Sequence, residues 1–224
     1  MQRFAVIVAG GSGTRMGVAQ PKQFLFLKGK PILAHTIERF FEADNTINII
    51  VVLSDAGLAM WSEYQETGAT IPPHQITLGG KTRTESVKKG LALVPHGALV
   101  AIHDAVRPFV TNEIINKSYE IAELKGCAVA AVPLKDSVRR KKGDVFVASN
   151  REDYRLVQTP QTFLSSIIID AYDSLALPDV TDDATVAELA DHEITLFEGT
   201  YENIKITTPV DLVFAEAILN SRKL

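Results

Sequence analysis

Short runs of apolar, largely β-branched residues alternate along this chain with segments that have the period of a helix. The runs are FAVIVA, INIIVVL, QITL, ALVAI and CAVAAV, at residues 4–9, 47–53, 75–78, 98–102 and 127–132. Runs of this kind are typical of strands that are buried on both faces. Strands separated by helices predict an α/β fold, in which helices cover both faces of a mostly parallel, doubly wound sheet.

The length fits one such unit, because 224 residues with 46% hydrophobic content can bury a substantial core. We therefore expect a single Rossmann-like domain over residues 1–224. Helices are predicted from Pro31, from Thr82 or Thr84, over residues 111–125, near 163–176 and 183–191, and from residue 209. Two more strands are predicted at 193–198 and 203–206.

The charge balance excludes a global basic surface. Twenty-seven acidic residues outweigh 23 basic ones and give a net charge of -4, so we expect neither nucleic acid nor a membrane as partner. The single cysteine, Cys127, lies in an apolar run and is expected to be an inert core residue. The chain has no apolar stretch near 18 residues, and its first run ends in glycines, which favours a buried strand over a signal peptide. These features predict a cytoplasmic protein.

Glycines and cations follow the first predicted strand in the segment AGGSGTRMGVAQPKQFL, residues 9–25. Glycines at the carboxyl end of a buried strand allow backbone N–H groups to approach phosphate oxygens. Neither the P-loop pattern nor the dinucleotide-binding fingerprint fits the spacing here. The segment, with Arg15 and Lys22, therefore predicts a long loop that wraps a polyphosphate.

Three further clusters follow predicted strands: LGGKTRTES, HDAVRP and NIKITTP, from residues 78, 103 and 203. Asp104 and Arg107 follow the carboxyl end of the strand predicted at 98–102. They belong either to a ligand-binding site or only to a weak surface ion pair. Lys205 and Arg151, taken alone, would be ordinary solvated side chains.

The segment from about 134 to 157 interrupts the alternation. It is rich in charge and alternates like two strands around a Lys-Lys-Gly-Asp turn, which predicts a protruding β-arm. Its apolar VFV strand would be an exposed edge unless another chain covered it, so we expect a homodimer. The alternative is an arm that folds back on its own sheet.

Taken together, the motifs resemble the 2-C-methyl-D-erythritol 4-phosphate cytidylyltransferases, which belong to the sugar-phosphate cytidylyltransferases. The resemblance rests, in chain order, on AGGSGTRMGVAQPKQFL, GGKTRTES, HDAVRPF, PLKDSVR, NREDYRLVQTPQTF, TDDA and YENIKITTPVDL. It implies that CTP and methylerythritol phosphate give a CDP-alcohol and pyrophosphate. It also implies Mg²⁺, or another divalent cation, and a homodimer joined through the arm.

The resemblance also implies roles for individual residues. Catalysis would rest on Arg15, Lys22, Arg151 and Lys205. The nucleotide would be bound by Ala9, Gly10, Gly11, Gly13, Thr14, Arg15, Lys22, Gly80, Arg83, Ser86, Asp104 and Ala105. The sugar-alcohol phosphate would be bound by Asp104, Arg107, Ser137, Arg151, Thr159 and Lys205. No metal ligand is assigned, because the triphosphate oxygens would supply most of the ligands of Mg²⁺.

Two positions depart from the family pattern. Ser137 stands where some members have threonine, and Lys81 stands where some have an acidic residue. Two other functions remain open at this stage. Ribitol 5-phosphate cytidylyltransferases share the glycine loop and the HDAVRPF motif, although PLKDSVR favours methylerythritol phosphate. A nucleotide-binding regulator without catalysis would need the glycine loop but not both sets of phosphate-binding cations.

Overall fold

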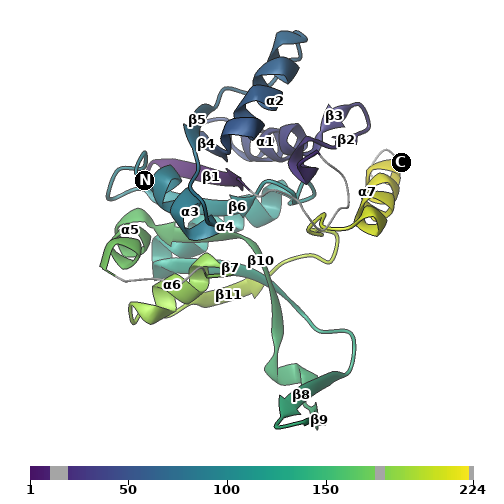
Figure 1. The fold of residues 1–224 in the computed structure, drawn as a ribbon. Coiled ribbons are helices and arrows are strands. Elements are labelled where there is room, and N and C mark those ends of the chain that lie inside the picture. Colours follow the sequence, from purple (N-terminus) through teal and green to yellow (C-terminus); the bar gives the residue numbers. More distant parts are fainter. Residues whose placement is uncertain (11–19, 175–179, 222–224) are drawn as a thin grey trace.

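A computed structural model describes residues 1–10, 20–174 and 180–221. Seven strands form one central sheet in the order β11-β7-β10-β6-β1-β4-β5 (Figure 1). Strand β10 runs antiparallel to its neighbours β6 and β7, and the other neighbouring pairs are parallel. The bounds of the strands are β1 Arg3–Ala9, β4 Asn48–Leu53, β5 Gln75–Leu78, β6 Leu99–Asp104, β7 Cys127–Pro133, β10 Arg155–Leu164 and β11 Thr195–Glu198.

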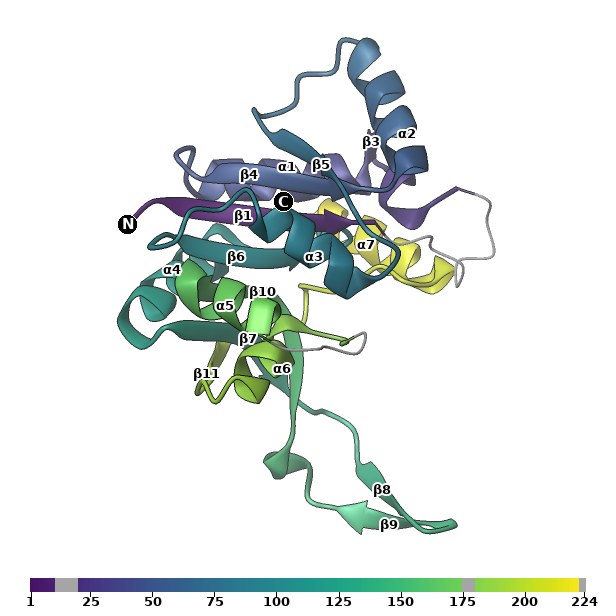
Figure 2. The ribbon, with the colours of Figure 1, turned by 60° about the vertical axis from the view of Figure 1, so that its left-hand side comes forward.

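Helices cover both faces of this sheet (Figure 2). Because side chains alternate along a strand, Ala5, Ile7 and Ala9 of β1 share one core cluster with α1, α2 and α4. Val6 belongs to the opposite cluster, with α3, α5 and α6. The doubly wound prediction is therefore confirmed. The helices are α1 Ile32–Ala43, α2 Asp55–Glu66, α3 Arg83–Leu91, α4 Asn112–Lys125, α5 Ser165–Ser174, α6 Asp183–Leu189 and α7 Pro209–Ser221.

Local side-chain contacts fix where two of the predicted helices begin. Thr82 is the N-cap of α3, and its hydroxyl accepts a hydrogen bond from the Glu85 N–H at 3.1 Å. Thr111 plays the same part for α4 through the Ile114 N–H. Helix α4 ends at Lys125, and its C-cap is Gly126, whose φ of 87° is in the left-handed region that glycine adopts without strain.

The arm is a separate hairpin of β8 (Val138–Lys142) and β9 (Val145–Ser149) that projects from the body of the molecule (Figure 2). Its turn contains Gly143, with φ 62°. A protruding arm is thus confirmed, and it does not fold back on the central sheet. Val145 and Phe146 are 60% and 65% exposed on it.

Several sequence predictions were wrong or incomplete. Residues 203–206 do not form a strand; one backbone hydrogen bond, from the Ile206 N–H to the Val106 carbonyl, ties them to the body. The helix predicted from residue 163 begins at Ser165, because β10 extends to Leu164. Helix α2 and the full length of β10 were not predicted. Two short strands, β2 (Phe26–Leu27) and β3 (Lys30–Pro31), and the 3-10 turns η2 (Lys22–Phe24) and η3 (Arg151–Asp153) complete the described elements.

Two other predictions concern single features. Cys127 is buried in β7, and its burial raises the pKa of the thiol to about 11, which agrees with an inert core residue. Among the described residues, no helix combines the length and the apolar character that crossing a bilayer requires.

Candidate active site

A pocket of about 360 Å³ opens at the carboxyl ends of β1 and β6. Ligands of open α/β sheets bind beyond these ends of the strands, so the position agrees with a substrate site. The lining comes from five separate segments of the chain. It consists of Val8, Ala9, Gly10, Lys22, Gln23, Gly80, Lys81, Thr82, Arg83, Ser86, Asp104, Ala105, Val106 and Lys205.

A second pocket of about 220 Å³ adjoins the first. The two pockets share Arg83, Asp104 and Lys205, so one wall of charged side chains separates two cavities. The rest of the smaller pocket is formed by Arg107, Val157, Gln158, Thr159, Gln161, Thr181 and Asp182. The paired cavities offer room for two ligands with a common boundary.

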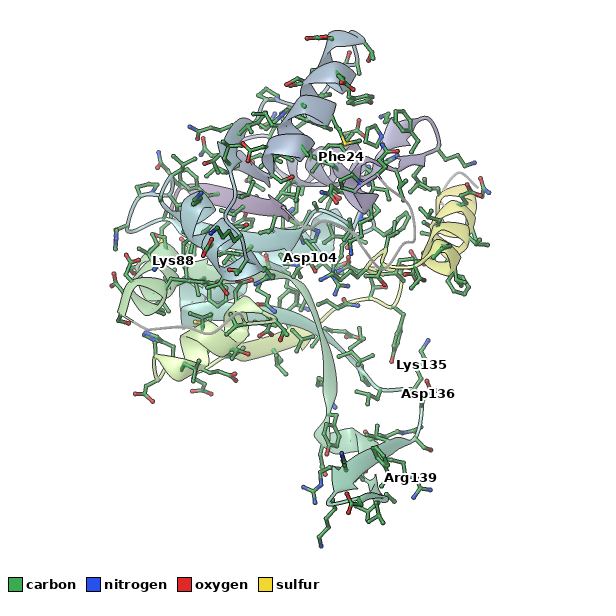
Figure 3. The ribbon with its side chains drawn as sticks, viewed as in Figure 1. Phe24, Lys88, Asp104, Lys135, Asp136 and Arg139 are labelled. Atoms are coloured by element: carbon green, nitrogen blue, oxygen red, sulfur yellow. The ribbon has the colours of Figure 1, made fainter. Side chains whose placement is uncertain are left out.

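Asp104 is the one carboxylate among the three residues of the shared wall, and it lies in the body of the molecule (Figure 3). Its Oδ2 lies 2.9 Å from the Nζ of Lys205 and 3.3 Å from the Nε of Arg107. Burial alone would raise the pKa of Asp104, but Lys205, Arg107 and the nearby Arg83 outweigh it and hold the pKa well below its usual value. Asp104 is therefore ionised throughout the physiological range, in a surround of net positive charge.

The structure decides between the two interpretations of Asp104 and Arg107. Both side chains are only 12% exposed, so this is not a solvated surface ion pair. Lys205 is likewise not an ordinary solvated lysine, because its ammonium is held on Asp104. Thr159 also lies here, and its Oγ1 accepts a hydrogen bond from the Asp104 backbone N–H at 3.1 Å.

The guanidinium of Arg83 is held by Asp183, a residue that the sequence analysis did not assign to the site. Its Nη1 and Nη2 donate to the two carboxylate oxygens of Asp183, at 3.0 Å and 2.5 Å. Tyr172 donates to the same carboxylate at 2.6 Å. Asp183 raises the pKa of Arg83 above its usual value against the opposing effect of burial, so the guanidinium stays charged. The TDDA motif, residues 181–184, was the one sequence signal at this position.

The turn between β5 and α3 brings Gly80 and Ser86 to the larger pocket. The Ser86 hydroxyl accepts from the Gly80 N–H at 3.1 Å and donates to the Thr82 carbonyl at 2.8 Å. The Oε2 of Glu85 accepts a hydrogen bond from the backbone N–H of Lys81 at 2.7 Å. The contacts hold this turn in one shape beside the cavity.

The glycine loop is described at its two ends. Ala9 and Gly10 line the larger pocket from β1, and Lys22 lines it from η2. The buried side chain of Gln23 joins the two ends, since its Nε2 donates to the Ala9 carbonyl at 2.7 Å. Gly11, Gly13, Thr14 and Arg15 lie outside the described residues. Of the other predicted nucleotide contacts, Gly80, Arg83, Ser86, Asp104 and Ala105 are all brought together here.

Ser137 and Arg151 are not brought to these pockets within one chain. Both belong to the arm and its root, and both are exposed. The Nη1 of Arg151 donates to the Lys135 carbonyl at 2.8 Å, and Figure 3 shows that Lys135 and Asp136 lie on the arm, away from Asp104. Neither residue lines the two pockets.

His103 precedes Asp104 and lies wholly inside the protein. Its Nε2 donates to the Arg107 carbonyl at 3.2 Å, and its ring packs edge-on against Phe40. Burial lowers the pKa of His103 to about 4, so the ring is neutral at physiological pH and supports the backbone of the HDAVRP segment. Within the described residues, no group of three His, Cys, Asp or Glu side chains could hold a metal ion.

Comparison with known proteins decides the family. A model of the 2-C-methyl-D-erythritol 4-phosphate cytidylyltransferases (IspD) matches residues 4–221. The chain belongs to this family. Enzymes of this name from Azobacteroides pseudotrichonymphae and Phocaeicola vulgatus are each 44% identical over 221 residues, which is 98% of this chain and 99% and 100% of theirs. The match confirms the resemblance and makes the chain a cytidylyltransferase.

Solved structures of the IspD family have the same fold. The 4-diphosphocytidyl-2C-methyl-D-erythritol synthase of Anaerococcus prevotii is 27% identical, with a TM-score of 0.83 over 97% of this chain and 95% of that one. The 2-C-methyl-D-erythritol 4-phosphate cytidylyltransferase of Thermus thermophilus is 30% identical, with a TM-score of 0.79 over 98% of this chain and 100% of that one. The α/β fold of this chain is thus a family property.

Proposed function

We propose that this enzyme transfers the cytidylyl group of CTP to 2-C-methyl-D-erythritol 4-phosphate in isoprenoid biosynthesis, with release of pyrophosphate. The larger pocket takes CTP, and the smaller one takes the sugar-alcohol phosphate. The observation that carries this assignment is the shared wall of Arg83, Asp104 and Lys205, which would place two phosphorylated ligands against each other. Family membership supports the choice of substrates.

The reaction needs positioning and charge more than a protein nucleophile. A phosphate oxygen of methylerythritol phosphate attacks the α-phosphorus of CTP, a new P–O bond forms, and the bond to the β-phosphate oxygen breaks as pyrophosphate leaves. Two anions repel each other, so cations must hold them within reach. Lys22 and Arg83 line the CTP pocket, and Arg107 and Lys205 line the other. Fixed cations of this kind stabilise the charge that develops on the departing pyrophosphate.

Lys22 and Arg15 are assigned to the α-phosphate and the leaving group. Lys22 stands on the CTP pocket. We expect Lys22→Ala to lower turnover more than CTP binding, because a contact made mainly in the transition state affects kcat more than affinity. An equal loss of both would mean that Lys22 only binds the nucleotide.

A divalent cation fits this site only as a partner of the triphosphate. Mg²⁺ is usually held by one or two carboxylates together with substrate phosphates. Asp104 is the carboxylate that both pockets share, so it is the residue that would contact the metal beside the triphosphate. When bound, Mg²⁺ would neutralise charge on the triphosphate.

The arm supports a homodimer. Val145 and Phe146 present apolar surface on it, and such surface favours a second copy of the chain. In that dimer, Ser137 and Arg151 of one chain would contact methylerythritol phosphate in the pocket of the other. Arg151→Ala should then leave CTP affinity nearly unchanged. A large drop in CTP affinity would mean that this arginine contacts CTP and not methylerythritol phosphate.

The test of the proposed function follows pyrophosphate in the presence of CTP and Mg²⁺. Methylerythritol phosphate and ribitol 5-phosphate are supplied separately. We expect release with methylerythritol phosphate. Release with ribitol 5-phosphate alone would overturn the substrate, and no release with either would indicate a nucleotide-binding regulator without catalysis.

A further inference from the structure

The segment of residues 199–206 carries Lys205 to the shared wall without forming a strand or a helix. It links β11 to α7, and the Ile206 N–H donates to the Val106 carbonyl at 3.0 Å. A lysine side chain has four rotatable bonds, so its ammonium can be held in one position only if the backbone that carries it is held as well. The contacts that fix this segment therefore determine where the Lys205 ammonium lies.

Three side-chain contacts tie this segment to the central sheet: Tyr201 donates to the Pro133 carbonyl, Gln158 donates to the Thr200 carbonyl, and Asn203 is the one nearest in sequence to Lys205. Asn203 is fully buried, and its Nδ2 donates to the Thr159 carbonyl at 2.8 Å and lies 3.4 Å from the Gln158 Oε1. The register of β10 on β7 shifts between Val157 and Gln161, so the regular ladder is interrupted at Thr159. The amide of Asn203 satisfies a carbonyl at the interruption.

The backbone of Asn203 reaches the other cation of the smaller pocket. Its carbonyl accepts a hydrogen bond from the Nη1 of Arg107 at 2.7 Å. Arg107 in turn contacts Asp104, whose N–H donates to the Thr159 hydroxyl. The contacts close a ring through Asp104, Arg107, Asn203 and Thr159, and Lys205 follows Asn203 by two residues.

We propose that Asn203 is a positioning residue for Lys205 and Arg107, and so for the phosphate of the sugar-alcohol substrate. The assignment of that substrate to the smaller pocket rests on the proposed function. The placement of the two cations rests on the contacts alone. Asn203 touches neither pocket directly; it acts through the cations that do.

The chemistry at position 203 requires a donor. Two acceptors, the Thr159 carbonyl and the Gln158 Oε1, face the Nδ2. Asn203→Asp keeps the volume but turns an oxygen toward both, and Asn203→Ala removes the contact and leaves the Thr159 carbonyl buried without its donor. An unmade buried hydrogen bond is costly, so both changes should release the segment.

The first experiment needs no substrate. Reductive methylation of lysines, followed by mass spectrometry, reports how firmly each ammonium is held. Lys88 is the internal reference, because its side chain is 41% exposed and paired with Asp173, against 39% exposure for Lys205 paired with Asp104. In both Asn203 variants we expect Lys205 to be methylated several-fold faster than in the parent enzyme, with Lys88 unchanged.

The second experiment measures kinetics with CTP and methylerythritol phosphate. We expect Asn203→Ala to raise the KM for methylerythritol phosphate roughly tenfold, the size of effect of one lost buried hydrogen bond, and to leave the KM for CTP within about twofold. Because Asn203 acts partly through Lys205, Asn203→Ala should raise the KM for methylerythritol phosphate by a smaller factor in a Lys205→Ala background than in the parent enzyme. Thr162→Val is the control, since it removes a buried hydrogen bond between β10 and Ser118 of α4 and touches neither Asn203 nor the pockets.

The outcomes separate the two ideas. Unchanged labelling of Lys205, equal rises in both KM values, additive losses with Lys205→Ala, or the same KM rise in Thr162→Val would each overturn the role of Asn203. If the parent enzyme shows no turnover with methylerythritol phosphate, the proposed function fails, and the labelling of Lys205 alone decides whether Asn203 positions it.

Discussion

The guanidinium of Arg83 and the carboxylate of Asp183 form a two-bond ion pair behind the wall that the pockets share, although 100 residues separate them in the chain. Asp183 has no exposed surface and is the first residue of α6. The backbone N–H groups of Asp183 and Ala184 both donate to the Gln161 Oε1 of β10, which fixes the start of this helix. The pair thus connects the CTP pocket to the central sheet.

We expect Asp183→Asn to lower the free energy of unfolding by about 3 kcal/mol, because removal of one partner leaves a charge poorly compensated in the interior. It should also raise the KM for CTP, since Arg83 loses its fixed orientation. Urea unfolding and initial rates measure the two effects. Asp173→Asn is the matched control, because Asp173 of α5 forms an exposed ion pair with Lys88 of α3. We expect it to cost less than about 1 kcal/mol, and an equal loss in the two variants would contradict a special role for Asp183.

The parts of this fold that the sequence predicts are those in which a local pattern matches a local cause. The run INIIVVL predicts β4 because both faces of that strand are buried, and TRTES predicts α3 because Thr82 caps it. The pattern of RLVQTPQTFL does not predict strand β10, because its polar residues are typical of a loop. Its buried polar side chains are satisfied by distant partners: Thr162 donates to Ser118, and Gln161 accepts from α6.

The same distinction applies to the site. Asp104 was a candidate because it follows an apolar run, and Lys205 became one only through the resemblance of its motif to a known family. Asp183 and Asn203 act on residues 100 and 44 positions away, and only the folded chain brings them together. A sequence pattern carries no information on a contact of that kind unless a related chain is already known.

The buried ring of His103 predicts a dependence of stability on pH. Its pKa is lowered from 6.5 to about 4 by burial, so below pH 6.5 the unfolded chain takes up a proton that the folded chain does not. Stability from this group is complete above pH 6.5 and falls by about 1.4 kcal/mol per pH unit toward pH 4. We expect His103→Gln to flatten the loss between pH 6.5 and 5, as measured by urea unfolding.

His96→Gln serves as the control for this pH effect, because His96 is an exposed histidine that precedes β6, whereas His103 is buried inside that strand. Asp104 does not contribute in this window, since its lowered pKa moves its own loss of stability to pH values below the usual carboxyl range. An identical slope in the two variants would show that His103 titrates normally.

The exposed apolar residues of the arm predict a dimer that one charge disrupts. Phe146→Asp places a carboxylate where we expect the second chain, so the protein should become monomeric at micromolar concentration in light scattering. Leu124→Asp, on α4, is the control, because Leu124 is even more exposed at 81%. Monomerisation should also raise the KM for methylerythritol phosphate while CTP binding persists. A parent protein that is already monomeric would rule out the arm as a dimer interface.

Gly80 predicts a link between backbone shape and CTP binding. A Cβ at this position would lie 2.2 Å from the Cβ of Glu85 and 2.5 Å from its Oε2, the oxygen that accepts from the Lys81 N–H. Gly80→Ala must therefore displace Glu85 and distort the turn beside the CTP pocket. We expect a loss of about 1–3 kcal/mol in unfolding free energy together with a higher KM for CTP.

Gly90→Ala separates these two effects. Its Cβ would lie 2.5 Å from Val6 Cγ1 and 2.9 Å from Val52 Cγ2, so it overpacks α3 against the sheet at a distance from the turn. The stability loss should be of the same order, because a methyl group again has no space, while the KM for CTP should stay near that of the parent enzyme. If Gly90→Ala raises that KM as much as Gly80→Ala does, the effect comes from a general shift of α3, and the turn at Gly80 has no separate part in binding the nucleotide.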